Sequence, residues 1–303
     1  MKILFFFTAH PRLDMIIKIQ AELLMTHILN KDKIYIVNDF NSNIAKSQIN
    51  YNSTKSNLYY YKSMFENLIT TFQNKGGDIT ILEYKHTKKF QHQSFNNIQE
   101  LKNYKYQEYG LGMSTASTMI SLMRDHKLDT ISLSHKIDRE LRNSIDVLTT
   151  IDYYNTEISP ELVYVFNGRM SVYAPIILYC KKNYINFKTF EFSLSFDKYH
   201  LLSNEIPHNI ICRKKEIIDL WADTTKPINE KREKGTAFFE NQRGGISTVE
   251  QSYIGLQNKE FDSKLLQGKE VVTFFNSSID EFAAVPGWED YIYLFEDETI
   301  AIE

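Results

Sequence analysis

The sequence has few cysteines and no long apolar run. Its two cysteines are Cys180, in an apolar stretch of helical character, and Cys212, in the strand-like Asn209–Cys212. We expect both to be small core residues in a reducing compartment rather than a disulfide or a metal pair. No run of about 18 apolar residues occurs, so no membrane span is predicted. The short run Ile3–Phe7 fits a first strand better than a signal peptide. These features predict a soluble, cytoplasmic protein.

Several motifs of well-defined chemistry are also missing. No Gly-x-x-x-x-Gly-Lys-Ser/Thr loop occurs, which argues against a P-loop nucleotidase. The corner after the first expected strand, Thr8–Pro11, lacks Gly-x-Gly-x-x-Gly and argues against a dinucleotide oxidoreductase. His86, His92 and His135 are scattered without metal-ligand spacing, and no His-x-Glu or Cys-x-x-Cys pair supports zinc. We therefore expect neither a metal nor a cofactor.

Length and charge limit the number of domains and the kinds of partner that the protein can have. With 303 residues, the chain is long enough for two domains, or for one large α/β domain with an incomplete second. A hydrophobic content of 43% supports a sizeable core. The net charge of −3 and the isoelectric point of about 6.3 give no electrostatic reason to expect nucleic acid or an anionic membrane as a partner.

Strand-like and helix-like segments alternate along the chain. The expected strands are residues 2–7, 33–37, 78–83, 162–166, 184–191, 207–212 and 269–275. The expected helices are residues 13–29, 59–73, 114–124, 137–156, 171–182, 214–221 and 229–243. Such alternation predicts βαβ units and a mostly parallel sheet. The polar residues 257–268 mark the best boundary, so we expect an N-terminal domain over 1–256, and a linker with the start of a second domain over 257–303.

The most informative stretch is Val163–Arg169. Its first residues are β-branched and aromatic, as in a buried strand, and Asn167, Gly168 and Arg169 then end the strand before a segment that can form a helix. In an open α/β sheet, ligands bind at the carboxyl ends of strands. Gly168 lets the backbone approach a ligand, the helix N-terminus favours anions, and Arg169 adds a permanent cation. The alternative interpretation is an ordinary turn with a solvated arginine.

A second group of polar residues follows the last expected strand, within Phe274–Phe282. Ser277 or Ser278 can cap a helix there, with Asp280 and Glu281 in its first turn. Two interpretations are open. The segment is either a capped helix and nothing more, or a phosphate- or sugar-binding turn that opens a second domain of the nucleotide-binding type.

Four ordered motifs resemble a bacterial family of capsular polysaccharide biosynthesis proteins. They are Asn167-Gly-Arg169, Glu191, residues 238–244 with Arg243, and residues 271–282; the Tyr-rich residues 104–112 also fit the family's N-terminal domain. The resemblance covers residues 100–290. It implies glycosyltransferases of the GT-B fold, with Rossmann-like parallel-sheet domains. The chain resembles the acceptor-side domain plus the first step of the donor-side domain, so the second domain is expected to be incomplete.

The resemblance also suggests roles for individual residues. A GT-B enzyme stabilises the departing nucleotide phosphate with Arg or Lys and helix N-termini rather than with a metal. Arg169 and Arg243 are therefore the candidates for contact with phosphate or a sugar carboxylate, and the alternative for each is a surface arginine or a structural ion pair. A general base would be a carboxylate or a histidine at a strand end, which points to Glu191 and His10. For His10 the alternative is a loop or capping histidine.

The sequence thus predicts sugar transfer from a nucleotide-sugar to a glycan acceptor during capsule or other surface-polysaccharide synthesis. A peripheral association with a polysaccharide assembly complex would fit this role. The alternative is a non-catalytic protein, either a degenerate transferase that binds glycan or a fragment that needs a second chain. Away from the motifs, we expect Lys136–Glu140 to form a solvated helix face, and Tyr59–Tyr61 to stack on sugars, pack in the core or meet a partner.

Overall fold

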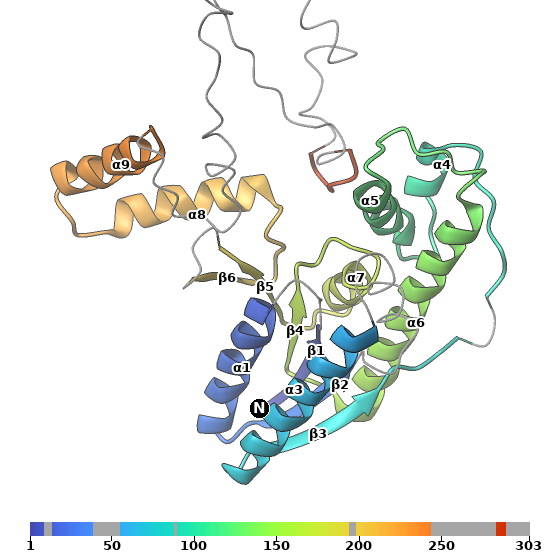
Figure 1. Cartoon of the computed structure of the whole chain (residues 1–303), viewed down its shortest axis with the longest axis horizontal. Helices are drawn as coiled ribbons and strands as arrows, with labels where there is room; N and C mark the ends of the chain where they lie inside the picture. Colours follow the sequence, from blue (N-terminus) through green and yellow to red (C-terminus); the bar gives the residue numbers. More distant parts are fainter. Residues whose placement is uncertain (9–13, 39–54, 88–89, 194–197, 244–282, 289–303) are drawn as a thin grey trace, which may run out of the picture. The chain divides into compact units, whose positions relative to one another are not determined.

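A computed structural model of the chain describes residues 1–8, 14–38, 55–87, 90–193, 198–243 and 283–288 (Figure 1). Contacts divide the chain into two compact units. Unit 1 contains residues 1–191, 200–210 and 278–294, and unit 2 contains residues 192–199, 211–277 and 295–303. The predicted boundary after residue 256 and the predicted strand 269–275 lie outside the described residues and stay predictions.

The described strands form one sheet of six, in the order β3-β2-β1-β4-β5-β6. They are β1 (Lys2–Phe7), β2 (Lys33–Asn38), β3 (Asp78–Glu83), β4 (Leu162–Phe166), β5 (Phe187–Phe192) and β6 (Tyr199–Ser203). The pairs β1–β2, β2–β3, β1–β4 and β4–β5 are parallel. The prediction of an α/β protein with a mostly parallel sheet is confirmed, and the strand order is compatible with a Rossmann-like fold.

Strand β1 lies at the centre of the sheet, and its sequence reflects that position. Every residue from Ile3 to Phe7 is buried, with an exposed fraction of 2% or less. A continuous apolar run is what a parallel strand needs when helices cover both faces of its sheet. At the edge of the sheet, Ile79 is the one buried residue of β3, and the other residues of this strand are partly or fully exposed.

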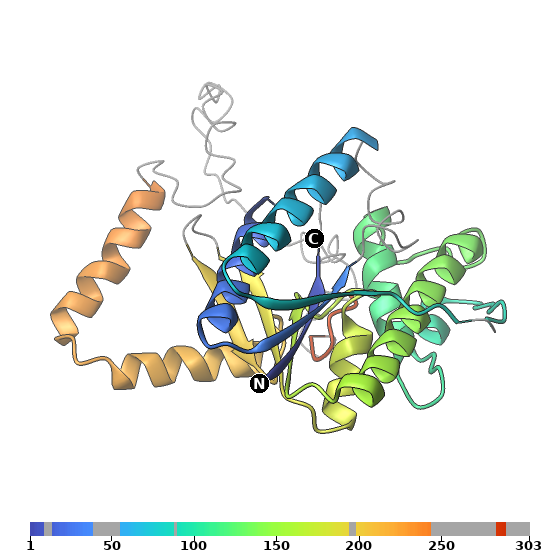
Figure 2. The ribbon, with the colours of Figure 1, turned by 90° about the horizontal axis from the view of Figure 1, so that it is seen from below.

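Helices cover both faces of the sheet. The helices of the described residues are α1 (Asp14–Leu29), α3 (Lys55–Asn74), α4 (Ile98–Lys102), α5 (Leu111–Met123), α6 (Ser134–Ile158), α7 (Ala174–Lys182), α8 (Ile210–Asp223) and α9 (Ile228–Arg243), of which α8 and α9 belong to unit 2 apart from Ile210. Helices α1 and α3 lie side by side on one face, and α6 and α7 lie on the other (Figures 1 and 2). Right-handed crossovers explain this division. The chain moves outward from β1 to β3 and later outward from β4 in the opposite direction, so the connecting helices of the two halves lie on opposite faces of the sheet.

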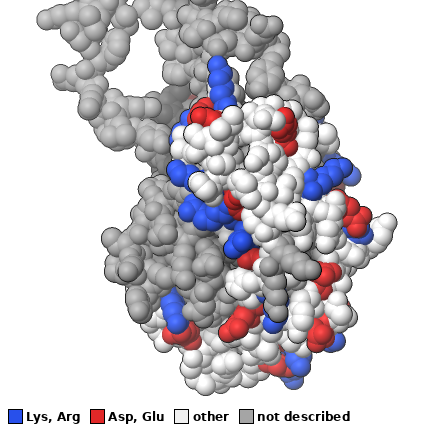
Figure 3. Space-filling view, turned by 90° about the vertical axis from the view of Figure 1, so that its right-hand side faces the viewer, with Lys and Arg blue, Asp and Glu red and all other residues white. Residues whose placement is uncertain are grey.

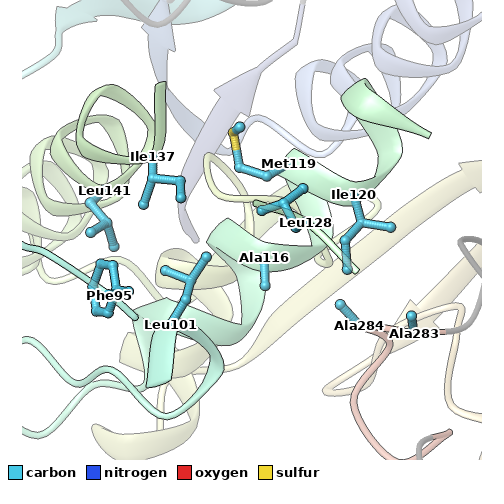
Figure 4. Packing of buried hydrophobic residues seen from close by; sticks show 10 residues of the cluster. All are labelled: Phe95, Leu101, Ala116, Met119, Ile120, Leu128, Ile137, Leu141, Ala283 and Ala284. Carbon is cyan, nitrogen blue, oxygen red and sulfur yellow. The ribbon is translucent and has the colours of Figure 1, made fainter. Parts of the chain in front are cut away.

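The helices α4 to α6, which precede β4, share a separate apolar cluster in unit 1. Its buried members are Phe95, Leu101, Ala116, Met119, Ile120, Leu128, Ile137, Leu141, Ala283 and Ala284 (Figure 4). Ala283 and Ala284 come from the short described segment near the end of the chain. The ammonium group of Lys102 also donates a hydrogen bond to the carbonyl of Ala283. Residues 283–288 therefore pack with these helices as part of unit 1.

Some local predictions were wrong. Residues 207–212 were predicted as a strand, but α8 begins at Ile210, so Cys212 is half-buried in a helix. A short apolar run such as Ile210–Cys212 fits either structure by its pattern, and the charged residues that follow extend the helix. Strand β6 and helix α4 were not predicted. Cys180 is fully buried on α7, as expected. Within the described residues, no helix combines the length and apolar character needed to span a membrane.

Candidate functional site at the turn after strand β4

The order of the sheet reverses between β1 and β4. Strands β2 and β3 lie on one side of β1, whereas β4 to β6 lie on the other. Connections from the two neighbouring strands therefore leave in opposite directions, and ligands of doubly wound sheets bind at the carboxyl edge beside such a reversal. Because β1 ends at Phe7 and β4 ends at Phe166, Thr8 and Asn167 are the first residues at this edge.

The turn after β4 has a left-handed backbone at two consecutive residues, with φ of +59° at Asn167 and +85° at Gly168. Asparagine adopts this conformation more readily than most residues, and glycine does so without strain. Space also requires glycine, because a Cβ at Gly168 would lie 2.8 Å from Cγ2 of Ile206 and 3.3 Å from Cγ1 of Ile177. The geometry of the turn thus explains the Asn-Gly pair.

The side chain of Asn167 connects the turn to the neighbouring strand. Its Oδ1 accepts a hydrogen bond from the backbone N–H of Arg169 at 3.0 Å, which closes an Asx turn. Its Nδ2 donates to Oε2 of Glu191 at 2.6 Å, a short bond of the kind that a charged acceptor makes. Glu191 lies near the end of β5. Two residues that the sequence placed at separate strand ends are therefore in direct contact.

Arg169 extends toward helix α5. Its Nη2 donates to Oγ of Ser121 at 3.2 Å, and the residue is half-buried. A guanidinium keeps its charge at any physiological pH, so this position supplies a fixed cation beside the Asn167–Glu191 pair. Arg169 was predicted as a ligand contact, and the structure brings it together with Asn167, Gly168 and Glu191.

His208, which the sequence did not single out, lies close to Arg169. Burial first, and then the nearby Arg169 charge, lower the pKa of His208 from 6.5 to about 4. Its Nδ1 is buried and has no hydrogen-bond partner among the described residues. The backbone carbonyl of His208 accepts a 2.6 Å hydrogen bond from the indole Nε1 of Trp288. A neutral imidazole thus stands beside the arginine at neutral pH and leaves the positive charge of Arg169 in place.

The residues after Arg169 are held between α5 and α6. The backbone N–H of Ser171 donates to Oγ1 of Thr118 at 2.8 Å, and its hydroxyl donates to Oε2 of Glu140 at 3.0 Å. The hydroxyl of Ser144 donates to the carbonyl of Ser171 at 2.8 Å. Only 2% of Glu140 is exposed. The prediction that Lys136–Glu140 is a solvated face is therefore wrong for Glu140, because a helical turn points that carboxylate inward at Ser171.

Helix α7 begins at Ala174, three residues later than predicted, and residues 171–173 form a turn. The turn is needed because Ser171 uses both its backbone and its hydroxyl in the bonds to α5 and α6. Pro175 then fits in the first turn of α7, where no N–H donor is required. The strand, the left-handed turn and the helix start together fix the position of Arg169.

The β1 side of the same edge is fixed by a buried glutamine. Oε1 of Gln20 accepts from the backbone N–H of Thr8 at 2.8 Å, and Nε2 of Gln20 donates to the carbonyl of Thr8 at 2.9 Å. Gln20 has no exposed surface, so both backbone groups of Thr8 are satisfied inside the protein. His10, the other candidate base, follows Thr8 but lies outside the described residues.

Further predicted site residues are not placed. Ser277, Ser278, Asp280 and Glu281 lie outside the described residues, and their roles stay predictions. Arg243 ends α9 in unit 2, and its side chain is not described. In the part of the chain that the structure describes, no group of His, Cys, Asp and Glu is arranged to hold a metal ion.

Comparison with known proteins gave no match. No family model, no curated protein and no solved structure aligns significantly with the chain. The resemblance carried by the four motifs therefore stays a prediction, and the site geometry is the main support for a functional proposal.

Proposed function

We propose that the chain is a glycosyltransferase of GT-B type that uses a nucleotide-sugar donor, with the turn after β4 in its substrate site. One observation carries the proposal. Asn167, Gly168 and Arg169 meet Glu191 at the carboxyl edge of the sheet, next to the point where the strand order reverses. This edge is where sheets of this kind bind nucleotides.

Arg169 supplies the charge that the departing group needs. In sugar transfer, the bond between the anomeric carbon and the phosphate oxygen breaks, and its electron pair leaves with the phosphate. A guanidinium can donate two parallel hydrogen bonds to phosphate oxygens, and a cation fixed in advance stabilises the charge as it develops. The contact of Arg169 with Ser121 keeps this cation oriented.

Glu191 supplies the base. The acceptor hydroxyl attacks the anomeric carbon, and its proton passes to a carboxylate within hydrogen-bond reach. The bond from Asn167 orients the Glu191 carboxylate, and the Asx turn in turn orients Asn167. The two predicted roles, phosphate contact and proton acceptance, are thus carried by side chains on one rigid turn and the adjacent strand.

The cellular context rests on the resemblance alone. Synthesis of capsule or another surface polysaccharide, action in the cytoplasm, and peripheral association with an assembly complex are parts of the proposal that the four motifs support. The site is compatible with an anionic donor because it holds a fixed cation, Arg169, at the carboxyl edge of the sheet.

Product formation tests the proposal. The full chain is incubated with a panel of nucleotide-sugars and oligosaccharide acceptors, and products are measured by mass spectrometry. Arg169→Ala is expected to lower the rate by roughly 10²–10³-fold, because a preorganised donor to the developing charge is lost. Glu191→Gln keeps an acceptor for Asn167 but removes the base. It is expected to lower kcat by roughly 10²–10⁴-fold with little change in the donor KM.

Arg213→Ala is the matched control. Arg213 lies on α8 and pairs with Glu216 at 2.8 Å, so its loss is expected to leave the rate unchanged. Wild-type product from Arg169→Ala would remove Arg169 from the site. Nucleotide-sugar binding without any product would favour the non-catalytic alternative, a degenerate transferase that binds its ligands.

A further inference from the structure

Unit 1 contains a pocket outside the site described above. It has a volume of about 230 Å³ and is lined by Phe90, Gln91, Gln93, Tyr104, Tyr106 and Ile145. Three of these residues are aromatic, two carry carboxamides, and one is aliphatic. Tyr104 and Tyr106 belong to the Tyr-rich residues 104–112, which the proposed transfer chemistry does not use.

The pocket and the turn after β4 lie on different faces of α6. Glu140 and Ser144 bond to Ser171, whereas Ile145 lines the pocket and the guanidinium of Arg142 lies 5.1 Å from the ring centre of Phe90. At 3.6 residues per turn, positions 140 and 144 share one side of a helix, and positions 142 and 145 share a side well away from it. The pocket is therefore a separate site.

The walls of the pocket are fixed by hydrogen bonds and ring packing. The backbones of Tyr106 and Tyr109 exchange two hydrogen bonds of 3.0 Å each, and the carbonyl of Tyr104 accepts from the N–H of Gly112 at 3.0 Å. The ring of Tyr104 packs edge-on against Phe95, with ring centres 5.6 Å apart. Phe90 and Tyr104 also pack on the apolar cluster of α4 to α6. A ligand would therefore meet walls that are already ordered, which lowers the entropy cost of binding.

Gln93, one of the two glutamines that line the pocket, is also held by hydrogen bonds. The backbone N–H of Gln93 donates to Oδ1 of Asp138 at 3.1 Å, and its Nε2 donates to the carbonyl of Gln91 at 3.1 Å. The backbone anchor does not depend on the Gln93 side chain. Replacement of that side chain therefore leaves the loop attached to α6.

The lining indicates a neutral ligand that has both apolar and hydroxyl groups. Among the described residues, no charged side chain lines the pocket, and the side of the molecule seen in Figure 3, where α4 to α6 lie, carries positive and negative side chains interspersed. Aromatic faces attract the weakly positive C–H groups of a sugar ring, and carboxamides both donate to and accept from hydroxyls. The volume is below the ~300–1,000 Å³ of pockets for drug-sized ligands, which suits a single ring.

We propose that this pocket binds one neutral pyranose unit of a glycan. The inference rests on the proposed function in one respect, because the glycan acceptor of a transferase would supply this sugar. Binding in the pocket would hold the acceptor chain at a point away from the reacting hydroxyl. The pocket then contributes to acceptor choice and takes no part in the chemical step.

Saturation-transfer NMR with the full chain tests the pocket. The probes are the methyl glycosides of glucose, galactose and N-acetylglucosamine, titrated without a donor. At least one is expected to bind, and Tyr106→Ala and Gln93→Ala are each expected to weaken it about tenfold, because a stacking face or a pair of hydrogen bonds is lost. Tyr184→Ala and Gln99→Ala, at exposed positions after α7 and on α4, are the matched controls and are expected to bind as the wild type does.

The outcomes separate this inference from the proposed function. Absence of binding by all three glycosides, or equal binding by the wild type and both pocket variants, would overturn the pocket assignment and leave nucleotide-sugar transfer standing. Arg169→Ala is expected to bind the glycosides normally. Loss of glycoside binding in Arg169→Ala, with normal binding in the pocket variants, would place the sugar at the turn after β4 and also refute the assignment.

Discussion

At the scale of single residues, the candidate site is built from polar groups that the fold buries and orients. Asn167 adopts a left-handed backbone and uses both ends of its carboxamide, one for Arg169 and one for Glu191. Glu140 supports the turn from inside the protein, where its Oε2 accepts a hydrogen bond from the hydroxyl of Ser171. Each of these residues has a polar side chain that costs stability unless it has partners, so their arrangement is set by hydrogen bonding rather than by packing alone.

The lowered pKa of His208 predicts a pH-dependent stability. Between the ordinary pKa of 6.5 and the folded value of about 4, the unfolded chain binds a proton that the folded chain does not. The free energy of unfolding therefore falls as the pH drops through this window, and the contribution is fully present above it. From about pH 7.5 to about pH 5, we expect His208 to account for a loss on the order of 2 kcal/mol.

Urea denaturation at the two pH values measures this effect. His208→Asn removes the titration and keeps a polar side chain, so the variant is expected to lose less stability than the wild type over the same interval. Equal losses in the wild type and in the variant would show that His208 does not carry the linkage.

At the scale of elements, close approach of the backbone decides where helices α4 and α5 pack. A Cβ added at Gly112, near the start of α5, would lie 1.8 Å from the carbonyl oxygen of Leu101 and 2.8 Å from the backbone N of Tyr104. No side-chain movement relieves a clash with backbone atoms. The glycine is therefore required by the contact between the end of α4 and the start of α5.

Gly112→Ala is expected to lower the free energy of unfolding by about 3 kcal/mol, because the clash has to displace α5 or the segment after α4. Gly110→Ala, two residues earlier, is the matched control. A Cβ there meets nothing within 4 Å, so a change within about 0.5 kcal/mol is expected. Chemical denaturation of both variants checks the prediction, and similar stabilities would contradict the close packing of α4 and α5.

Most elements were predictable from the sequence because their local patterns are strong. The apolar runs of β1 and β4 are rich in aromatic and β-branched residues, which favours buried strands, and the predicted bounds of both, residues 2–7 and 162–166, are those observed. The position of Asn167–Arg169 at a strand end followed from those bounds, and that of Glu191 followed from the predicted strand 184–191, which overlaps β5 but starts three residues early and ends one residue early. Their mutual contact follows from the pairing of β4 with β5, which no local pattern contains.

The features that could not be predicted from the sequence depend on tertiary structure. His208 belongs to no motif, and its role arises from a turn that brings it next to Arg169. Glu140 lies in a run of charged residues, a pattern that is typical of a solvent-exposed helix face. Its burial follows from the fold, which places Ser171 against it. The aromatic pocket combines residues 90–93, 104–106 and 145, and their proximity required knowledge of how α4 to α6 fold together.

At the scale of the whole molecule, the sheet determines where a ligand can bind. The order β3-β2-β1-β4-β5-β6 places the reversal between β1 and β4, and the predicted motif sits on the β4 side of that reversal. The Thr8–Gln20 pair fixes the β1 side. The central claim is that this edge of unit 1 binds a nucleotide-sugar through Arg169.

Isothermal titration calorimetry of the full chain with a panel of uridine, guanosine and cytidine nucleotide-sugars tests that claim most directly. We expect that at least one binds, and that Arg169→Ala weakens it at least about tenfold, the loss expected for a hydrogen bond to a charged group. Arg213→Ala should bind as the wild type does. The absence of binding across the panel, or equal affinities of the wild type and Arg169→Ala, would contradict the account.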